Sequence, residues 1–198
     1  MAVLPIVTYD DPVLTTQARP LEPGMKELEK LIDDMFETMY EAEGVGLAAP
    51  QIGKSLQLFV VDADAITEEE EGATYGPRVY INPDIEALGE ETGELEEGCL
   101  SLPDVREKVT RPLRIRIRYL DSHFQEHEEI CDGWFARVLQ HEYDHLKGVL
   151  FIDYLGSFRK RLIKKKLDAI KFGKVEASYE LAAKRAADAP AANESPME

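Results

Sequence analysis

The segment from Gln140 to His145 contains the pattern His-Glu-x-x-His, whose residues can perform hydrolytic chemistry on a metal ion. On a helix, His141 and His145 lie four residues apart on one face, so both imidazoles can bind one divalent cation. Glu142 points about 100° further round the helix, and its carboxylate can lie beside the metal without binding it. A general base belongs at that position. The pattern therefore predicts a catalytic metal centre.

A hydrolytic metal usually needs a third protein ligand and one open position. Zinc peptidases with this motif take that ligand from further along the chain, where Glu176 and Glu180 are candidates close to the C-terminus. Upstream, Cys99 is one of only two cysteines and stands between Gly98 and Pro103, which mark a loop. We favour Cys99 as the ligand and expect the other cysteine to be an ordinary buried side chain.

A third segment, Gly44–Gln51, reads Gly-Val-Gly-Leu-Ala-Ala-Pro-Gln. Its glycines permit a close approach of the backbone to a ligand, and Gln51 offers an amide donor. The segment has neither the spacing nor the lysine of a phosphate-binding loop. Alone it is a weak signal.

Together the three segments resemble the peptide deformylase family in its bacterial forms. That family carries Gly-x-Gly-Leu-Ala-Ala-Pro-Gln, Glu-Gly-Cys-Leu-Ser and Gln-His-Glu-x-Asp-His in this order, and the sequence matches every fixed position. The resemblance covers about residues 4–172. It implies a metal-dependent hydrolase that removes the formyl group from the N-terminal formyl-methionine of nascent proteins and releases formate.

The resemblance also implies roles for single residues. Cys99, His141 and His145 become the ligands of one divalent metal, with Fe²⁺ expected and Zn²⁺, Ni²⁺ or Co²⁺ able to occupy the same site. Thiolate and imidazole suit several of these ions, so the sequence does not choose among them.

The same resemblance makes Glu142 the general base. It assigns the developing oxyanion to the Gln51 side chain and the Leu100 backbone N–H, besides the metal. Glu97 is expected either to orient groups behind the ligands or to be a surface acid. The residues expected to bind the substrate are Val45, Gly46, Arg106, Trp134 and Val138.

The methionine side chain needs an apolar pocket. One and two turns before His141 on its helix stand Val138, Arg137 and Trp134. We expect Trp134 and Val138 to line the pocket with Val45, the alternative for Trp134 being plain core packing. Arg137 is a poor pocket floor and is expected to reach the rim, where it could meet a substrate carbonyl.

Hydrophobic periodicity predicts the elements that position these residues. We expect helices over residues 25–42, 133–147 (closed by Gly148) and 157–170. We expect strands over residues 56–61, 78–81 (stopped by Asn82-Pro83), 113–120 and 124–130, with a charged loop over 63–77. The resemblance implies an α+β fold, with antiparallel strands around a central metal-binding helix and a C-terminal helix. The catalytic domain is expected to span residues 1–175, and residues 176–198 to form a disordered acidic tail.

Composition limits the partners. The chain has 23 basic and 39 acidic residues and a net charge of −16, which argues against binding DNA. No apolar run approaches the roughly 18 residues of a membrane span, and the N-terminus lacks the basic residues of a secretory signal. Two cysteines make no disulfide framework. We therefore expect a protein of the reducing cytoplasm with no membrane partner.

One region is basic, since residues 159–174 hold eight Lys and Arg and one acid. This could be an ordinary solvated helix face. The resemblance implies instead that the helix docks on the ribosome near the exit tunnel. Two other functions stay open from the residues alone: a metallopeptidase of the His-Glu-x-x-His type, and a ribosome-associated module with a structural metal.

Overall fold

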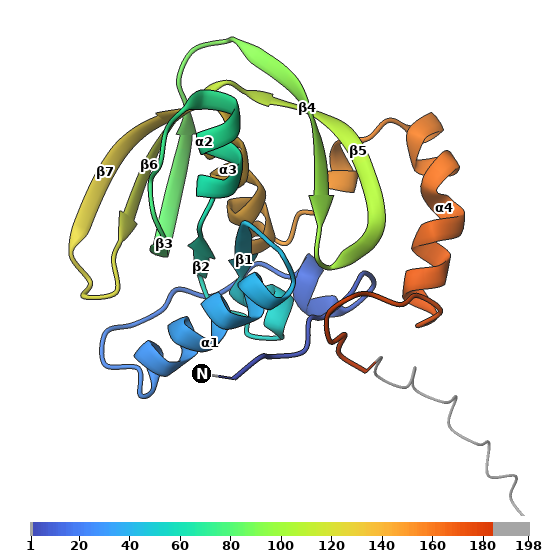
Figure 1. The fold of residues 1–198 in the computed structure, drawn as a ribbon, viewed down its shortest axis with the longest axis horizontal. Coiled ribbons are helices and arrows are strands. Elements are labelled where there is room, and N and C mark those ends of the chain that lie inside the picture. Colours follow the sequence, from blue (N-terminus) through green and yellow to red (C-terminus); the bar gives the residue numbers. More distant parts are fainter. Residues whose placement is uncertain (1, 184–198) are drawn as a thin grey trace, which may run out of the picture.

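Seven strands form two antiparallel sheets in the computed structural model, which describes residues 2–183 (Figure 1). The larger sheet has the order β1-β2-β3-β6-β7, and β4 and β5 form a separate hairpin. The strands are β1 (Gly46–Ala48), β2 (Leu58–Val61), β3 (Arg78–Ala87), β4 (Thr92–Cys99), β5 (Leu102–Pro112), β6 (Arg114–Leu120) and β7 (Glu126–Asp132).

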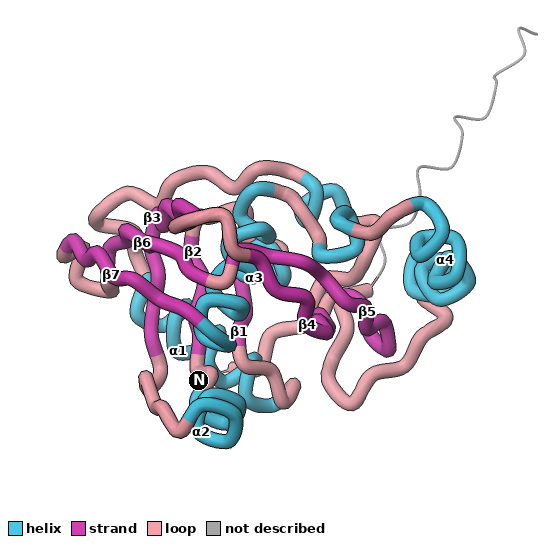
Figure 2. The backbone as a smooth tube through the Cα atoms, turned by 90° about the horizontal axis from the view of Figure 1, so that it is seen from above, coloured by secondary structure: helices cyan, strands magenta, loops and turns pink. Residues whose placement is uncertain are grey.

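Helices cover these sheets, and one of them lies at the centre. The helices are α1 (Leu28–Glu41), α2 (Asp64–Glu71), α3 (Gly133–Lys147) and α4 (Ser157–Lys171), with 3-10 turns at Pro12–Thr15, Ala49–Ile52 and Phe151–Tyr154. Figure 2 shows α3 between the larger sheet and the β4-β5 hairpin, and α4 at the outside beside β5. The expected α+β fold with a central helix and a C-terminal helix is confirmed. None of the helices in residues 2–183 is long and apolar enough to span a membrane.

The central helix α3 has the predicted bounds. Its buried face includes Phe135 and Leu139, which pack with Phe59 of β2 and Ile115 of β6 in one core cluster. Gly148 ends the helix in the left-handed conformation, with φ 73°, which glycine adopts without a steric penalty. The helix therefore carries its polar residues to a fixed place between the two sheets.

The region expected to be a charged loop, residues 63–77, contains the helix α2. Thr67 on its inner face is fully buried, while Gly72 ends the helix with φ 66°. The Asp64 carboxylate accepts hydrogen bonds from the backbone N–H groups of Tyr75 and Gly76, which closes the segment on itself. Tyr75 stacks on Phe135 of α3, with ring centroids 3.9 Å apart. Local hydrogen bonds and this aromatic contact therefore order a segment that was predicted to be a loop because of its many charged residues.

Strand β3 does not stop at Asn82-Pro83 as expected but runs on to Ala87. The pairing with β6 shifts register between Ile81 and Asp84, so the dipeptide forms a bulge. The Asn82 side chain accepts a hydrogen bond from the Leu21 N–H and donates one to the Leu21 carbonyl. Proline is tolerated because the bulge removes the need for its missing N–H in the ladder.

The domain continues beyond residue 175, where the tail was expected to begin. Residues 176–183 pack on the domain: the N–H of Ile6 donates to the Glu180 carbonyl at 2.9 Å, and that of Ala182 to the Ile6 carbonyl at 2.8 Å. Residues 176–183, which fall in the tail expected to be disordered, are therefore held in the structure by this backbone pairing with the N-terminal segment. Residues 184–198 lie outside the described part of the chain.

Candidate metal centre

Three potential metal ligands meet at the inner end of β4 and one face of α3. The ligand atoms of Cys99, His141 and His145 all lie within 4.8 Å of one another. The Sγ of Cys99 is 3.3 Å from the Nε2 of His145. Cys99 is the last residue of β4, at the tight turn into β5, and not a residue of an open loop as expected. The hairpin therefore fixes the thiol opposite the helix.

Glu97 lies behind this cluster and holds His141. The Nδ1 of His141 donates to Oε2 of Glu97 at 2.9 Å, which leaves Nε2 for a metal. Glu97 is 5% exposed, so it is not a surface acid. Burial opposes its charge, but hydrogen bonds from His141 and Arg111 hold the pKa of the Glu97 carboxyl well below its usual range. A permanent carboxylate therefore orients this imidazole.

Arg137 is a buried part of the cavity wall and does not extend to the rim, which corrects the sequence expectation. Its Nη1 donates to Glu97 Oε1 and to the Val109 carbonyl, both at 2.9 Å, and its Nη2 donates to the Gly93 carbonyl at 2.7 Å. Its side chain is 4% exposed. A buried guanidinium needs such partners, and the β4-β5 hairpin provides them.

The sequence analysis missed the outer part of this polar network. Arg111 of β5 donates to Glu97 at 2.7 Å and to Asp144 of α3 at 2.6 Å. The Tyr154 hydroxyl bonds the other Asp144 oxygen at 3.2 Å, and the Arg111 guanidinium lies 4.8 Å from the centre of the Tyr154 ring. Asp144 belongs to the histidine motif, but no spacing in the sequence relates it to Arg111. The network therefore becomes visible only once β5 is placed.

Glu142 lies beside the ligand cluster with an unused oxygen. It is 4% exposed, and its Oε2 has no hydrogen-bond partner among the described residues. Burial raises the pKa of Glu142 from 4.5 to about 7. A Cβ atom at Gly46 would approach the Glu142 carboxylate oxygen to 2.5 Å, so the glycine makes room for it. A buried, unpartnered carboxylate beside three soft and borderline ligands fits a hydrolytic metal.

Gln51 and Leu100 lie on the other side of Cys99. The Gln51 side chain is anchored, because its Oε1 accepts the Ala48 N–H at 2.8 Å. Its Nε2 is 3.5 Å from Cys99 Sγ and 3.4 Å from Ser101 Oγ. The amide donor of Gln51 therefore lies next to the thiol.

A cavity of about 480 Å³ opens over these groups. Its walls include the ligands Cys99 and His141 and all three residues expected to be catalytic, whereas His145 is buried behind them with 1% exposed. Glu176 lines the cavity too, but neither it nor Glu180 belongs to the ligand cluster. The five residues expected to bind substrate all line it: Val45, Gly46, Arg106, Trp134 and Val138.

The family model for polypeptide deformylase matches residues 3–161. The chain belongs to the peptide deformylase family. It is 51% identical to the peptide deformylase of Salinibacter ruber, with 92% of this chain and 95% of that protein covered. It is 49% identical to that of Cytophaga hutchinsonii, over 90% of this chain and 96% of that protein.

Solved structures of peptide deformylases share the fold. The enzyme of Ehrlichia chaffeensis, crystallised in complex with actinonin, superposes with a TM-score of 0.78 at 39% identity, covering 88% of this chain and 99% of that one. The Legionella pneumophila peptide deformylase gives a TM-score of 0.76 at 39% identity, over 87% and 98%. Peptide deformylases are metal-dependent hydrolases that remove N-terminal formyl groups from nascent proteins, and this chain is such an enzyme.

Proposed function

We propose that Cys99, His141 and His145 bind one Fe²⁺ ion. The enzyme hydrolyses N-terminal formyl-methionine to formate and a free amine, and Glu142 is the general base of this reaction. The observation that carries this proposal is the buried, unpartnered Glu142 oxygen beside three ligand atoms within 4.8 Å of one another. Three protein ligands leave a coordination position open for the reaction.

Glu142 moves the proton in this scheme. When bound, the metal supplies Lewis acidity to the reacting water and the formyl oxygen. Glu142 takes the proton from the attacking water at its free Oε2 and passes it to the leaving amine. Its pKa of about 7, raised by burial, suits a group that must accept and then donate a proton near neutral pH.

The oxyanion has two further donors, the Nε2 of Gln51 and the backbone N–H of Leu100. Gln51 is held by the Ala48 N–H at 2.8 Å and is 1% exposed, so its amide needs little reorganisation during the reaction. Leu100 follows the ligand Cys99 directly. The β4-β5 hairpin that holds the thiol therefore also holds Leu100, and the 3-10 turn Ala49–Ile52 holds Gln51.

The lining of the cavity supports a formyl-methionyl peptide as the substrate. Val45, Trp134 and Val138 offer apolar surface for a methionine side chain, and the proposal gives Gly46 and Arg106 contacts with the peptide backbone beyond it. Formyl is the smallest acyl group, so a closely walled site can reject acetyl by size.

Thiolate and imidazole ligands suit Fe²⁺, Zn²⁺, Ni²⁺ and Co²⁺ alike, so the choice of Fe²⁺ rests on the family resemblance. Oxidation of Fe²⁺ or of the Cys99 thiolate would remove activity. Anaerobic purification with a metal assay tests the choice, and one Zn²⁺ per chain in fully active native protein would contradict it.

Formate release from formyl-Met-Ala-Ser tests the reaction, with acetyl-Met-Ala-Ser as the matched substrate. We expect formate from the first peptide only. Glu142→Ala should lose several orders of magnitude in rate and keep its metal, because Glu142 is not a ligand. Unchanged formate release by Glu142→Ala would reject Glu142 as the general base. Cleavage of an internal peptide bond would favour a peptidase, and absence of any hydrolysis by the unchanged protein would favour a binding module.

We propose that the enzyme works in the cytoplasm, where nascent chains are made, and that α4 brings it to the ribosome. Phe158 and Leu162 on its outer face are 72% and 60% exposed, beside a row of exposed Lys and Arg. Apolar groups within a basic face favour a partner with phosphate charge over plain solvation.

Ribosome co-sedimentation at low salt tests this role of α4. The double variant Arg161→Glu with Lys165→Glu should sediment less while its activity on a tripeptide stays unchanged. The same charge change away from α4, at Lys26 and Lys54, is the control. Equal loss in both variants would remove the docking proposal.

A further inference from the structure

The segment that follows α4, residues 174–183, is here called the C-terminal strap. It leaves α4 through a closing hydrogen bond from the Lys174 N–H to the Ala169 carbonyl. It then returns across the molecule and pairs in parallel with the N-terminal segment, at Ile6 and Leu181 (Figure 1, red beside blue). The strap is therefore attached at both ends.

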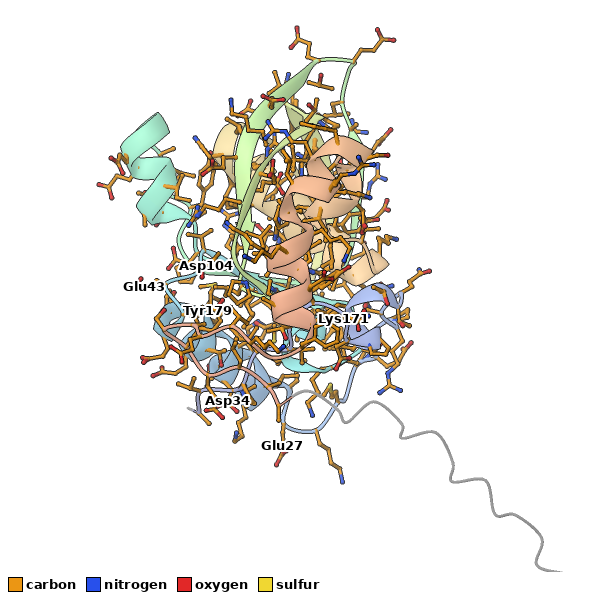
Figure 3. All side chains as sticks on the ribbon, turned by 90° about the vertical axis from the view of Figure 1, so that its right-hand side faces the viewer. Glu27, Asp34, Glu43, Asp104, Lys171 and Tyr179 are labelled. Carbon is orange, nitrogen blue, oxygen red and sulfur yellow. The ribbon has the colours of Figure 1, made fainter. Side chains whose placement is uncertain are left out.

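Between these attachments the strap forms part of the cavity wall. Glu176, Ala177, Ser178 and Tyr179 line the same cavity as Glu142. Tyr179 is seen with the cavity residues Glu43 and Asp104 in Figure 3. The family match ends at residue 161, so this wall lies outside the matched region.

Tyr179 contacts the turn between the metal ligand and β5. Its hydroxyl donates to the Leu100 carbonyl at 2.7 Å, and its ring packs on the core cluster that includes Leu100. Burial raises the pKa of Tyr179 far above neutral, so the hydroxyl keeps its proton as donor. Ser101, which follows Leu100, is held on both sides. Its hydroxyl accepts from the Gln51 side chain, and its carbonyl accepts from the Tyr9 N–H at 2.9 Å.

We propose that Tyr179 is a positioning residue of the reaction, which the strap brings to the active site from the C-terminal end of the chain. The inference rests on the proposed function, in which the Leu100 N–H donates to the oxyanion. A hydrogen bond to the Leu100 carbonyl holds the Leu100–Ser101 peptide unit. This unit adjoins the Cys99–Leu100 unit that carries the Leu100 N–H, so the bond restricts the directions open to that N–H. A donor that is held in place before the reaction stabilises the transition state more than the ground state.

The experiment compares Tyr179→Phe with Tyr40→Phe in the metal-loaded full chain. Both variants lose only a hydroxyl, and that of Tyr40 bonds Asp62 at 2.7 Å on an exposed surface away from the cavity walls. For Tyr179→Phe we expect kcat on formyl-Met-Ala-Ser to fall about tenfold, with KM within about twofold. Tyr40→Phe should keep both constants.

Hydrogen exchange supplies a readout that needs no activity. Backbone amides of residues 98–103 should exchange faster in Tyr179→Phe and at the normal rate in Tyr40→Phe. A strap that only stabilises the domain would lower the melting temperature and leave kcat unchanged.

The outcomes separate the two proposals. Formate release by the unchanged protein, with kcat of Tyr179→Phe equal to that of the control, overturns the inference alone, whatever the exchange shows. A rise in KM with unchanged kcat overturns it too, because the strap would then only help to bind the substrate. Absence of formate release by the unchanged protein overturns the proposed function first, and the inference with it.

Discussion

Gly46 and Glu142 approach each other so closely that position 46 has no room for a side chain. An added Cβ atom would lie 2.5 Å from a carboxylate oxygen, under the separation that real Cβ atoms show. Gly46→Ala must therefore displace the carboxylate of the general base or the β1 backbone. We expect kcat to fall about hundredfold, because a displacement of about 1 Å is that costly at a reacting centre.

Metal content should stay unchanged in this variant, because residue 46 supplies no ligand atom and the three candidate ligands lie on other elements. Gly156→Ala is the control, since nothing lies within 4 Å of its added Cβ. The measurement is kcat of both variants on formyl-Met-Ala-Ser. Full activity in Gly46→Ala would mean that Glu142 takes another position during the reaction.

Arg111 and Arg118 are close in the sequence but differ in what their loss should cost. Arg111 is 3% exposed in its side chain and bridges Glu97 and Asp144, whereas Arg118 and its partner Glu128 are each 53% exposed. Removing one member of a buried pair leaves an uncompensated charge and costs about 3–5 kcal/mol. Exposed pairs contribute about 0–1 kcal/mol.

Urea unfolding of Arg111→Met and Arg118→Met tests this difference. Arg111→Met should lose at least about 3 kcal/mol of unfolding free energy, and its metal affinity should fall about 10- to 100-fold as Glu97 loses its orientation. Equal stability of the two variants would show that Arg137 alone suffices to balance Glu97.

The C-terminal end of α3 packs closely against the 3-10 turn Pro12–Thr15. Gly148 has φ 73°, and a Cβ there would lie 2.7 Å from the Thr15 carbonyl carbon. Gly72, which ends α2 with φ 66°, has nothing within 4 Å of its added Cβ. Both positions carry the left-handed strain of about 1–2 kcal/mol for a non-glycine residue, but only Gly148 adds a backbone collision.

Gly148→Ala should therefore lower the unfolding free energy by about 1–3 kcal/mol more than Gly72→Ala does. Equilibrium unfolding in urea measures both. Equal losses would mean that the Thr15 turn moves away without cost, and that α3 is not held against it.

The sequence predicts α3 with its true bounds because hydrophobic spacing, the histidine motif and a capping glycine agree there. It does not predict β4 or β5, although both are longer than the strand expected at 78–81. Strand β4 is mostly acidic and has few buried residues, so it lacks the alternating apolar pattern of a strand. Pairing with β5 holds it in place. Local signals therefore predict elements whose stability is local.

The same limit applies to the site. Spacing on a helix identifies His141, His145 and Glu142 as candidates, whereas Cys99 is chosen from its neighbours Gly98 and Pro103 and from the family resemblance. Arg137 is wrongly placed at the rim, because its partners Glu97, Val109 and Gly93 come from a hairpin that spacing on α3 cannot reveal. Tyr179 is missed because an acidic, alanine-rich end looks disordered, whereas pairing with Ile6 holds the strap in place.

The charged residues at the rim of the cavity are mostly acidic, as is the whole molecule. The chain carries a net charge of −16. Four exposed acids line the cavity, and the only exposed base among its lining residues in the described chain is Arg106. The acids are Glu43, Glu96, Asp104 and Glu176. A peptide that enters this rim meets a negative potential that a low-dielectric wall focuses.

Formylated peptides with a basic residue after methionine should therefore react better than acidic ones. We expect kcat/KM for formyl-Met-Lys-Ser to exceed that for formyl-Met-Glu-Ser about tenfold at low ionic strength, mainly through KM. The difference should shrink at 1 M salt, where the Debye length falls to about 3 Å. Formyl-Met-Ala-Ser, without a charged side chain, is the control for salt effects on the enzyme itself.

Two substitutions assign the preference to the rim rather than to the net charge. Glu43→Gln with Asp104→Asn should reduce the ratio between the two peptides by at least half, while the same number of charges removed at Glu27 and Asp33, which do not line the cavity, should leave it unchanged. A ratio near one in the unchanged protein, or an equal effect of both double variants, would contradict this reading, because a local potential must depend on the charges nearest to the substrate.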